Sequence, residues 1–221
     1  MKNAKSPVVC VVLGGGGHAR VLVDCLLETP GIALWGILER DRGSWGSDIY
    51  GVKILGGDEL LPQLRKLGVT HFVVGLGGAG DNTPRERLFR QALGESLLPL
   101  GVRHPSALCS ARAQIGVGAQ VLAGVIVNAG AEIGANVLLN TGSIVEHDCH
   151  VDDYVHVATG ARVGGAVWVH RAAHIGAGAT VRQGITIGAR ALVGAGAVVV
   201  DDVEAGTVVV GVPARALRRV A

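Results

Sequence analysis

Aliphatic residues recur every six positions through the C-terminal half of the chain. From Ile115 onward, fifteen successive hexads open with an aliphatic residue, and the position four residues later is always small or aliphatic. If about half of all residues were apolar at random, fifteen consecutive matches would arise about once in 30,000 trials. An α-helix needs apolar spacing near 3.6 residues and a flat strand a period of two. The six-residue period therefore predicts a β-solenoid. The opening residues are Ile115, Val121, Val127, Ile133, Leu139, Val145, Val151, Val157, Val163, Val169, Ile175, Val181, Ile187, Val193 and Val199.

Each hexad is predicted to supply one short strand and one turn. The aliphatic residue points into a prism, the small residue fits beneath a corner, and glycine eases the turn. Three hexads complete one triangular coil, so the fifteen hexads predict about five coils. Because the six-residue register is unbroken over 115–203, we expect no long loop to interrupt the solenoid.

The N-terminal half follows a different pattern, in which apolar runs alternate with segments of helical spacing. VVCVVL at 8–13 predicts a buried strand, GGGGH at 14–18 a turn, and ARVLVDCLLE at 19–28 a helix. Further strands are predicted at 34–38 and 72–76, and helical segments at 58–67 and 84–92.

This order of elements predicts a small parallel α/β unit. We therefore expect two domains: a Rossmann-like α/β domain over 1–104 and a β-helix domain with a C-terminal tail over 105–221.

The glycine turn after the first strand is a candidate phosphate site. Gly14, Gly16 and Ala19 match a G-x-G-x-x-A fingerprint, and Glu39 follows the second strand, where a ribose-binding acid would lie. Taken alone, this favours NAD, but 1–104 is too short for the usual six-stranded dinucleotide domain, so a mononucleotide fits better. Glycines let the backbone approach phosphate, and a helix N-terminus offers free N–H groups. A tight turn capped by a histidine is the alternative.

A second loop is predicted beside the first. VVGLGGAGDNTPRERLF places Gly77, Asn82 and Arg85 between the third strand and the next helix, at the carboxyl edge of the sheet. Arg85 either pairs with a phosphate or is a solvated residue at a helix start, and the sequence leaves both open.

Composition narrows the partners and the location. Glycine accounts for 35 of 221 residues and aromatic residues for 3%, which indicates a core of small aliphatic side chains. The net charge is +2 with dispersed Lys and Arg, so no nucleic-acid partner is expected. Mean hydropathy is +0.43, yet no apolar run reaches the ~20 residues that cross a bilayer. Without a signal-peptide pattern, we expect a cytoplasmic protein with no membrane insertion. The four cysteines lack CxxC pairs and are predicted to be reduced.

Three segments carry a resemblance that covers nearly the whole chain: GGGGHA, LNTGSIVEHDCHVDDYVHVATGA and VVGVPARALRR. They resemble the nucleotide-amino-sugar N-acetyltransferases of the hexapeptide-repeat superfamily, such as the bacillosamine-pathway and perosamine enzymes, and more distantly the sialic-acid O-acetyltransferases. The resemblance implies a left-handed parallel β-helix and a homotrimer with active sites between subunits. It also implies acetyl-CoA as co-substrate in a groove along the β-helix and a nucleotide-linked amino sugar held by the N-terminal domain.

The resemblance assigns the chemistry to His147 and Asp148. His147 matches the general base, Asp148 the adjacent acid that raises its basicity, and His156 a residue that contacts acetyl-CoA. The hexad register agrees, because His147 is the third residue of the hexad that opens at Val145, so its imidazole should project from a turn. His156 is the last residue of its hexad and should also face outward.

Other family positions concern the nucleotide sugar. Gly16, Gly17 and His18 match the phosphate loop, and Gly77 matches a glycine near the nucleotide. The family usually shows two acids after the second strand, whereas this chain reads Glu39-Arg40, and the loop after Gly77 is longer than usual.

Two alanines match the cofactor positions of the family. Ala177 and Ala195, eighteen residues apart, match backbone contacts to the pantetheine arm of CoA. Three further histidines, His150, His170 and His174, form no set at recognisable metal-ligand spacing. No metal is expected.

The implied reaction transfers acetyl from acetyl-CoA to the amine of a nucleotide-linked amino-deoxysugar, with a 4-amino sugar as the expected acceptor. His147 takes the amine proton, and Asp148 orients the ring. Cys149 stands at an inward position of its hexad, so no covalent acyl-enzyme is expected. The alternatives are O-acetylation of a sialic-acid-type sugar, a non-catalytic nucleotide-sugar-binding trimer, and an NAD-binding regulator.

Overall fold

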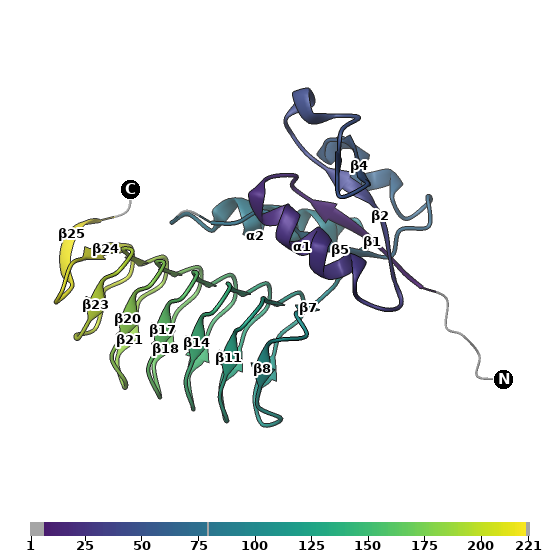
Figure 1. Cartoon of the computed structure of the whole chain (residues 1–221). Helices are drawn as coiled ribbons and strands as arrows, with labels where there is room; N and C mark the ends of the chain where they lie inside the picture. Colours follow the sequence, from purple (N-terminus) through teal and green to yellow (C-terminus); the bar gives the residue numbers. More distant parts are fainter. Residues whose placement is uncertain (1–6, 79, 220–221) are drawn as a thin grey trace. The chain divides into compact units, whose positions relative to one another are not determined.

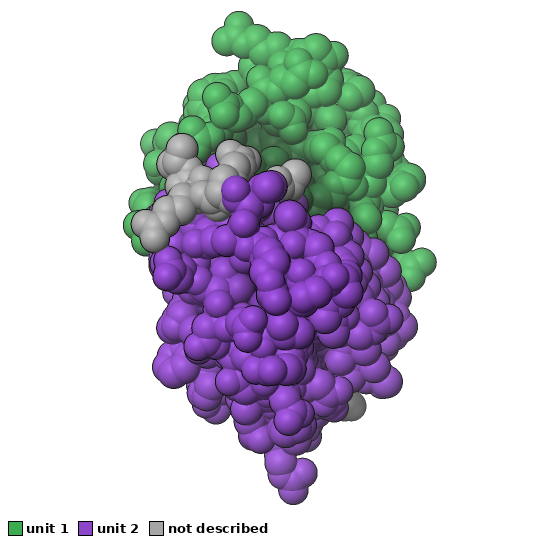
Figure 2. Space-filling view, turned by 90° about the vertical axis from the view of Figure 1, so that its left-hand side faces the viewer, with its two compact units in different colours: residues 1–77, 84–100 green, residues 78–83, 101–221 purple. Residues whose placement is uncertain are grey.

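The computed structural model describes residues 7–78 and 80–219, with the backbone alone for 218 and 219. The chain folds into two compact units, which are coloured separately in Figure 2. The first unit takes residues 1–77 and 84–100, and the second takes residues 78–83 and 101–221. The short segment 78–83 therefore belongs with the C-terminal residues, although it interrupts the first unit along the chain.

The first unit is built around a six-stranded sheet with the strand order β3-β4-β2-β1-β5-β6. β1 pairs in parallel with β2 on one side and β5 on the other, whereas β3 runs antiparallel to β4. One face of α1, which lies beside β1 and β2 in Figure 1, is buried: Ala19, Leu22, Val23, Cys25 and Leu26. The strands are β1 (Val8–Leu13), β2 (Ile32–Leu38), β3 (Asp48–Ile49), β4 (Val52–Gly56), β5 (His71–Val74) and β6 (Leu98–Pro99). The α-helices are α1 (Gly17–Leu27) and α2 (Thr83–Gly94), with short 3-10 turns η1 (Arg42–Ser44) and η2 (Asp58–Gln63).

The predicted parallel α/β unit is confirmed, with differences in its second half. The first strand has the predicted bounds, and the helix predicted at 84–92 lies within α2. The prediction of a helical segment at 58–67 is wrong, because only the short 3-10 helix η2 (Asp58–Gln63) forms there. η2 contains Pro62, whose missing N–H opposes a regular helix.

The second unit is a left-handed parallel β-helix, so the predicted fold class is confirmed (Figure 1). Strands of successive coils pair in parallel, as Gln120 does with Leu138 and Leu138 with His156, eighteen residues apart. The last strand, Arg215–Arg219, instead pairs antiparallel with Thr207–Val210. Three sheets form the three faces of a prism.

Face 1 consists of β7 (Val102–Arg103), β10 (Gln120–Val121), β13 (Leu138–Leu139), β16 (His156–Val157), β19 (His174–Ile175), β22 (Leu192–Val193), β24 (Thr207–Val210) and β25 (Arg215–Arg219). Face 2 consists of β8 (Leu108–Cys109), β11 (Ile126–Val127), β14 (Ile144–Val145), β17 (Arg162–Val163), β20 (Thr180–Val181) and β23 (Val198–Val199). Face 3 consists of β9 (Gln114–Ile115), β12 (Glu132–Ile133), β15 (His150–Val151), β18 (Trp168–Val169) and β21 (Thr186–Ile187).

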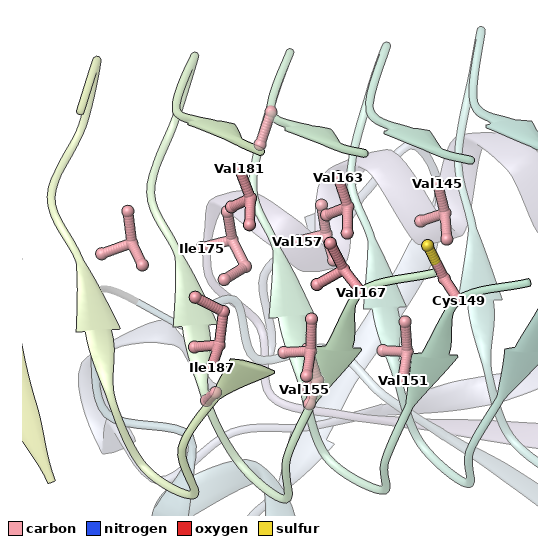
Figure 3. Packing of buried hydrophobic residues seen from close by; sticks show 14 of the residues in the cluster. Val145, Cys149, Val151, Val155, Val157, Val163, Val167, Ile175, Val181 and Ile187 are labelled. Atoms are coloured by element: carbon pink, nitrogen blue, oxygen red, sulfur yellow. The ribbon is translucent and has the colours of Figure 1, made fainter. Parts of the chain in front are cut away.

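The core of the prism is formed by the residues that the hexad register predicts to point inward. From Val121 to Val199, every hexad-opening residue is at most 4% exposed, and the small residues four positions later are at most 5% exposed. Figure 3 shows these side chains converging inside the coils. The one difference is Ile115, which is 40% exposed because it lies on β9, the outermost strand of its sheet.

The solenoid starts earlier than the hexad pattern predicts. β7 and β8 already pair in coil register with β10 and β11. The sequence pattern missed them because Arg103 stands opposite the inward Val121. The Arg103 guanidinium donates to the Ala107 carbonyl oxygen at 3.3 Å. Among the described residues, no helix is long and apolar enough to cross a membrane.

Candidate active site

The glycine turn of the first unit presents open backbone at the start of α1. Gly14 has φ +102°, a conformation that favours glycine, and Gly16 is the N-cap residue of α1. A Cβ added at Gly16 or Gly17 would meet no atom within 4 Å. The first turn of α1 carries no acidic residue. The start of this helix can therefore accept an anionic group.

Glu39 supports this turn from the end of β2. Its Oε2 accepts a hydrogen bond from the Gly15 N–H at 2.5 Å, and its Oε1 accepts from the Asp41 N–H at 3.1 Å. The carboxylate thus braces the glycine loop, a contact that the predicted ribose role did not include. Arg40, the next residue, is exposed.

The loop after β5 closes the other side of the turn. A Cβ at Gly77 would lie 3.4 Å from the Cβ of His18, so these two predicted residues are neighbours. Arg85 of α2 is fully buried and donates to the carbonyl oxygens of Leu76 and Val74. Burial lowers the pKa of Arg85 to about 10, so the guanidinium stays charged at neutral pH. Both interpretations that the sequence left open for Arg85, a phosphate ligand and a solvated residue, are therefore wrong. Its side chain holds the loop after β5 in place.

His147 and Asp148 form a hydrogen-bonded pair on the prism corner between faces 2 and 3. The His147 Nδ1 lies 2.9 Å from the Asp148 Oδ2. Their side chains are 60% and 69% exposed, so the pair stands in the open, as the hexad register predicts for His147. With Nδ1 directed at the carboxylate, the Nε2 of His147 is the ring nitrogen available as a base.

Glycines one coil away leave room for this pair. A Cβ at Gly165 would lie 2.6 Å from the His147 Nε2, and a Cβ at Gly130 would collide with the Asp148 carboxylate. Asp148 itself has φ +57°, a left-handed conformation that Asp tolerates better than most residues. Neither glycine was singled out by the sequence, although their eighteen-residue spacing from the pair could have identified them.

The neighbouring Cys149 is a core residue. Its side chain is buried, its Sγ donates to the Gly164 carbonyl oxygen at 3.0 Å, and burial raises the pKa of its thiol. A protonated, buried thiol is a poor nucleophile, which agrees with the predicted inward position.

His156 lies on face 1 and points away from the prism core, but it is not exposed as the sequence suggested. Only 3% of its surface is accessible. Its ring contacts that of His174 edge to face, with centroids 4.7 Å apart, and its Nε2 lies 3.3 Å from the Asn140 Nδ2. Burial lowers the pKa of His174. The sequence could not reveal this burial, because the residues that cover His156 include Gly78, which is far away along the chain.

Ala177 and Ala195 lie one above the other on the corner between faces 1 and 2. Both are exposed, and the Ala177 carbonyl oxygen accepts from the Gly196 N–H at 2.8 Å. Among the described residues, neither alanine N–H has a hydrogen-bond partner. These two N–H groups are available to a ligand that carries carbonyl oxygens.

The predicted site residues of the second unit therefore fall into two groups. His147 follows β14 on face 2 and leads into face 3, whereas Ala177 follows β19 on face 1 and leads into face 2. The structure places the predicted base on a different corner from the predicted CoA residues.

Two further histidines, His150 and His170, pair with carboxylates on face 3. The His170 Nδ1 lies 3.0 Å from the Asp152 Oδ2, and the His150 Nδ1 lies 3.4 Å from the Glu132 Oε2. The Trp168 ring stacks on the His170 imidazole and lies tilted against the His150 imidazole, with ring centroids 5.1 Å apart in both pairs. No group of three or more His, Cys, Asp or Glu residues that could hold a metal ion occurs within the described part of the chain.

A β-helix of this kind, joined to an α/β unit with a glycine loop, places the chain among the hexapeptide-repeat acyltransferases. A family model described as the PglD N-terminal domain matches residues 10–92. No curated protein sequence matches the chain.

Solved structures give the family more narrowly. Perosamine N-acetyltransferase from Caulobacter crescentus, a histidine-to-asparagine variant in complex with CoA and GDP-perosamine, is 36% identical, with a TM-score of 0.88 over 95% of this chain and 96% of that one. The acetyltransferase domain of PglB from Neisseria gonorrhoeae, in complex with acetyl coenzyme A, is 32% identical, with a TM-score of 0.86 over 96% of this chain and 100% of that one. WeeI from Acinetobacter baumannii is 27% identical, with a TM-score of 0.83 over 95% and 99%. The chain belongs to this family of acetyltransferases.

Proposed function

We propose that this protein transfers the acetyl group of acetyl-CoA to the amine of a nucleotide-linked amino-deoxysugar, a 4-amino sugar. The observation that carries the proposal is the hydrogen-bonded His147–Asp148 pair on an open corner of the β-helix. Two similar proteins have the matching ligands in their structures: CoA and GDP-perosamine in one, acetyl coenzyme A in the other.

In the proposed reaction, the sugar amine attacks the thioester carbonyl carbon directly. The nitrogen becomes acidic as the N–C bond forms, and the His147 Nε2 accepts its proton. Asp148 holds the Nδ1–H tautomer and stabilises the imidazolium. The C–S bond then breaks, and CoA leaves as a thiolate that takes up a proton. The buried Cys149 thiol takes no part.

We assign the cofactor contacts to His156, Ala177 and Ala195. The two alanines offer backbone N–H groups on an exposed corner, eighteen residues apart. The pantetheine arm of CoA carries two amide groups, whose carbonyl oxygens suit such donors. The absence of large side chains at these positions leaves room for an extended arm along the corner.

We assign the nucleotide sugar to the first unit, within the domain predicted over 1–104, and the acyl transfer to the domain predicted over 105–221. Gly16 and Gly17 expose the start of α1 to the diphosphate, and His18, beside Gly77, donates to it. Glu39 and Arg40 lie at the end of β2, on the side of the ribose or base. Glu39 keeps acceptor capacity beyond its two backbone hydrogen bonds.

We further propose that the active site is shared between subunits of a homotrimer. His147 and the pair Ala177 and Ala195 lie on different corners of one prism. A site that uses both corners is completed when the His147 corner of one subunit meets the Ala177 corner of the next, as a closed cyclic assembly allows. The cytoplasmic location stays a prediction.

The direct test replaces His147 with alanine and measures thiol release from acetyl-CoA with UDP-, GDP- and dTDP-linked 4-amino sugars. We expect His147→Ala to lose about 10²-fold or more in kcat, the usual contribution of a general base. The control is His104→Ala, an imidazole in an outer coil that contacts only Ser106 among its described side-chain partners. Near-normal turnover of His147→Ala would refute the assignment.

The shared site is tested by mixing two inactive variants. Ala177→Trp blocks the cofactor corner, and His147→Ala removes the base. If the two corners come from different subunits, mixed trimers contain intact sites, and random assortment restores about a quarter of the wild-type activity. Mixtures that stay inactive would show that both groups must come from one chain.

A further inference from the structure

Gly78, the first residue of the short segment 78–83, covers His156, although it precedes the β-helix by many residues. It belongs to the same compact unit as the β-helix. A Cβ added at Gly78 would lie 3.2 Å from the His156 Nδ1, closer than ordinary contact. A Cβ added at Gly80 would lie 2.5 Å from a side-chain methyl group of Leu192, two strands further along face 1. Gly78 and Gly80 therefore lie directly on the outer side of face 1.

One side chain fastens the segment to the β-helix. Asn82 is 2% exposed, and its Nδ2 donates to the carbonyl oxygens of Ala172, at 3.2 Å, and Ala173, at 3.0 Å. Its Oδ1 faces Gly78, where an added Cβ would collide with it. Asn82 thus contacts both the residue that covers His156 and the two residues that lead into His174.

Both parts of the molecule that Asn82 contacts also border the His156 ring. Ala173 is followed directly by His174, whose ring packs edge to face against His156 with centroids 4.7 Å apart. Gly78 bounds His156 on its Nδ1 side, and Asn140 lies at its Nε2. The neighbours that restrict the orientation of His156 therefore depend in part on where Asn82 holds the segment and the corner.

We propose that Asn82 is a positioning residue for acetyl-CoA binding, which acts by holding Gly78 and His174 against the His156 ring. The inference rests on the proposed contact between His156 and acetyl-CoA. It gives the longer loop after Gly77 a role in the cofactor site. Asn82→Ala removes both hydrogen bonds, and Asn82→Asp keeps the size of the side chain but replaces the donor with an acceptor that faces two carbonyl oxygens.

The test measures the KM for each substrate and the resonances of the His156 ring. Asn82→Ala and Asn82→Asp should raise the KM for acetyl-CoA about tenfold, the loss expected when a buried hydrogen-bonded group is removed. The KM for the nucleotide sugar, and kcat at saturating acetyl-CoA, should stay within about twofold. In NMR spectra assigned with His156→Gln, the ring resonances of His156 should shift. Asp81→Asn, an exposed neighbour in the same segment, is the matched control and should change neither.

Two results would overturn the inference: an unchanged KM for acetyl-CoA in folded Asn82→Ala, or unchanged His156 resonances. If the Asn82 variants do not fold, Gly78→Ala carries the test, because its Cβ presses on the same ring and should produce the same KM change and resonance shift. A failure of the proposed function is recognised separately. In that case, His156→Gln itself leaves the KM for acetyl-CoA unchanged.

Discussion

Gly165→Ala tests whether the position of the His147 ring matters for turnover. The added Cβ would lie 2.6 Å from Nε2 and 2.7 Å from Cε1 of His147, whereas ordinary contact begins at 3.4 Å. The ring must therefore withdraw by the difference, about 0.8 Å. Gly165 has no positive φ, so the backbone accepts alanine without strain.

A displacement near 1 Å at a reacting group can cost about 10²-fold, so we expect kcat to fall about 10- to 100-fold. The side chain of His147 is 60% exposed and can move into solvent, so the melting temperature should change by no more than about 2 °C. The assay is thiol release under saturating substrates, beside a thermal unfolding scan.

The matched control is Gly101→Ala, where an added Cβ meets only the Ala119 carbonyl oxygen, at 3.7 Å. It should retain wild-type turnover. A Gly165→Ala enzyme with normal kcat would refute the reasoning, because the base would then work from a position that the structure excludes.

Three further predictions concern the other parts of the account. Asp148→Asn fits the left-handed corner conformation but removes the charge that orients His147. The kcat should therefore fall on the order of 10²-fold with unchanged thermal stability. A kcat equal to that of the wild type would contradict the role of the carboxylate. Gly17→Asp places a negative charge at the open start of α1. The KM for the nucleotide sugar should therefore rise at least about tenfold, while the KM for acetyl-CoA stays constant. A rise in the KM for acetyl-CoA alone would reverse the assignment of the two sites. Burial lowers the pKa of His174 below its ordinary value of 6.5, so below about pH 6.5 the unfolded chain binds a proton that the folded protein does not. The free energy of unfolding should then decrease as the pH falls, by up to about 1.4 kcal/mol per pH unit. Urea titrations at several pH values check this, and a slope that is the same in His174→Leu would exclude His174 as its source.

The β-helix could be predicted from the sequence because each coil needs aliphatic side chains at the same inward positions. Val121 and the aliphatic residues at later hexad starts all have to fill one narrow prism, so the six-residue period survives in the sequence. The hexad pattern did not reveal the first coil, because the polar, exposed Arg103 stands at the register position of the inward Val121. In the first unit, the segment at 58–67 has helical apolar spacing, but Pro62 limits it to a 3-10 turn.

The arrangement of the candidate site could be predicted from the sequence where a residue contacts its sequence neighbour. His147 and Asp148 are adjacent, and their hydrogen bond follows from the turn that carries them. His156 differs, because its burial depends on Gly78 and Asn82, and no local pattern records which distant segment covers a strand. The role of Arg85 could not be predicted either, because its partners, the carbonyl oxygens of Val74 and Leu76, come close to it only in the folded unit.

The central claim is tested most directly by the structure of the product. The wild-type protein is incubated with acetyl-CoA and each nucleotide-linked 4-amino sugar, and the product is analysed by mass spectrometry and NMR together with thiol release. The account predicts one acetyl group per thiol released, bound to the sugar nitrogen as an amide that resists hydroxylamine. An ester that hydroxylamine cleaves, or thiol release without an acetylated nucleotide sugar, would contradict it.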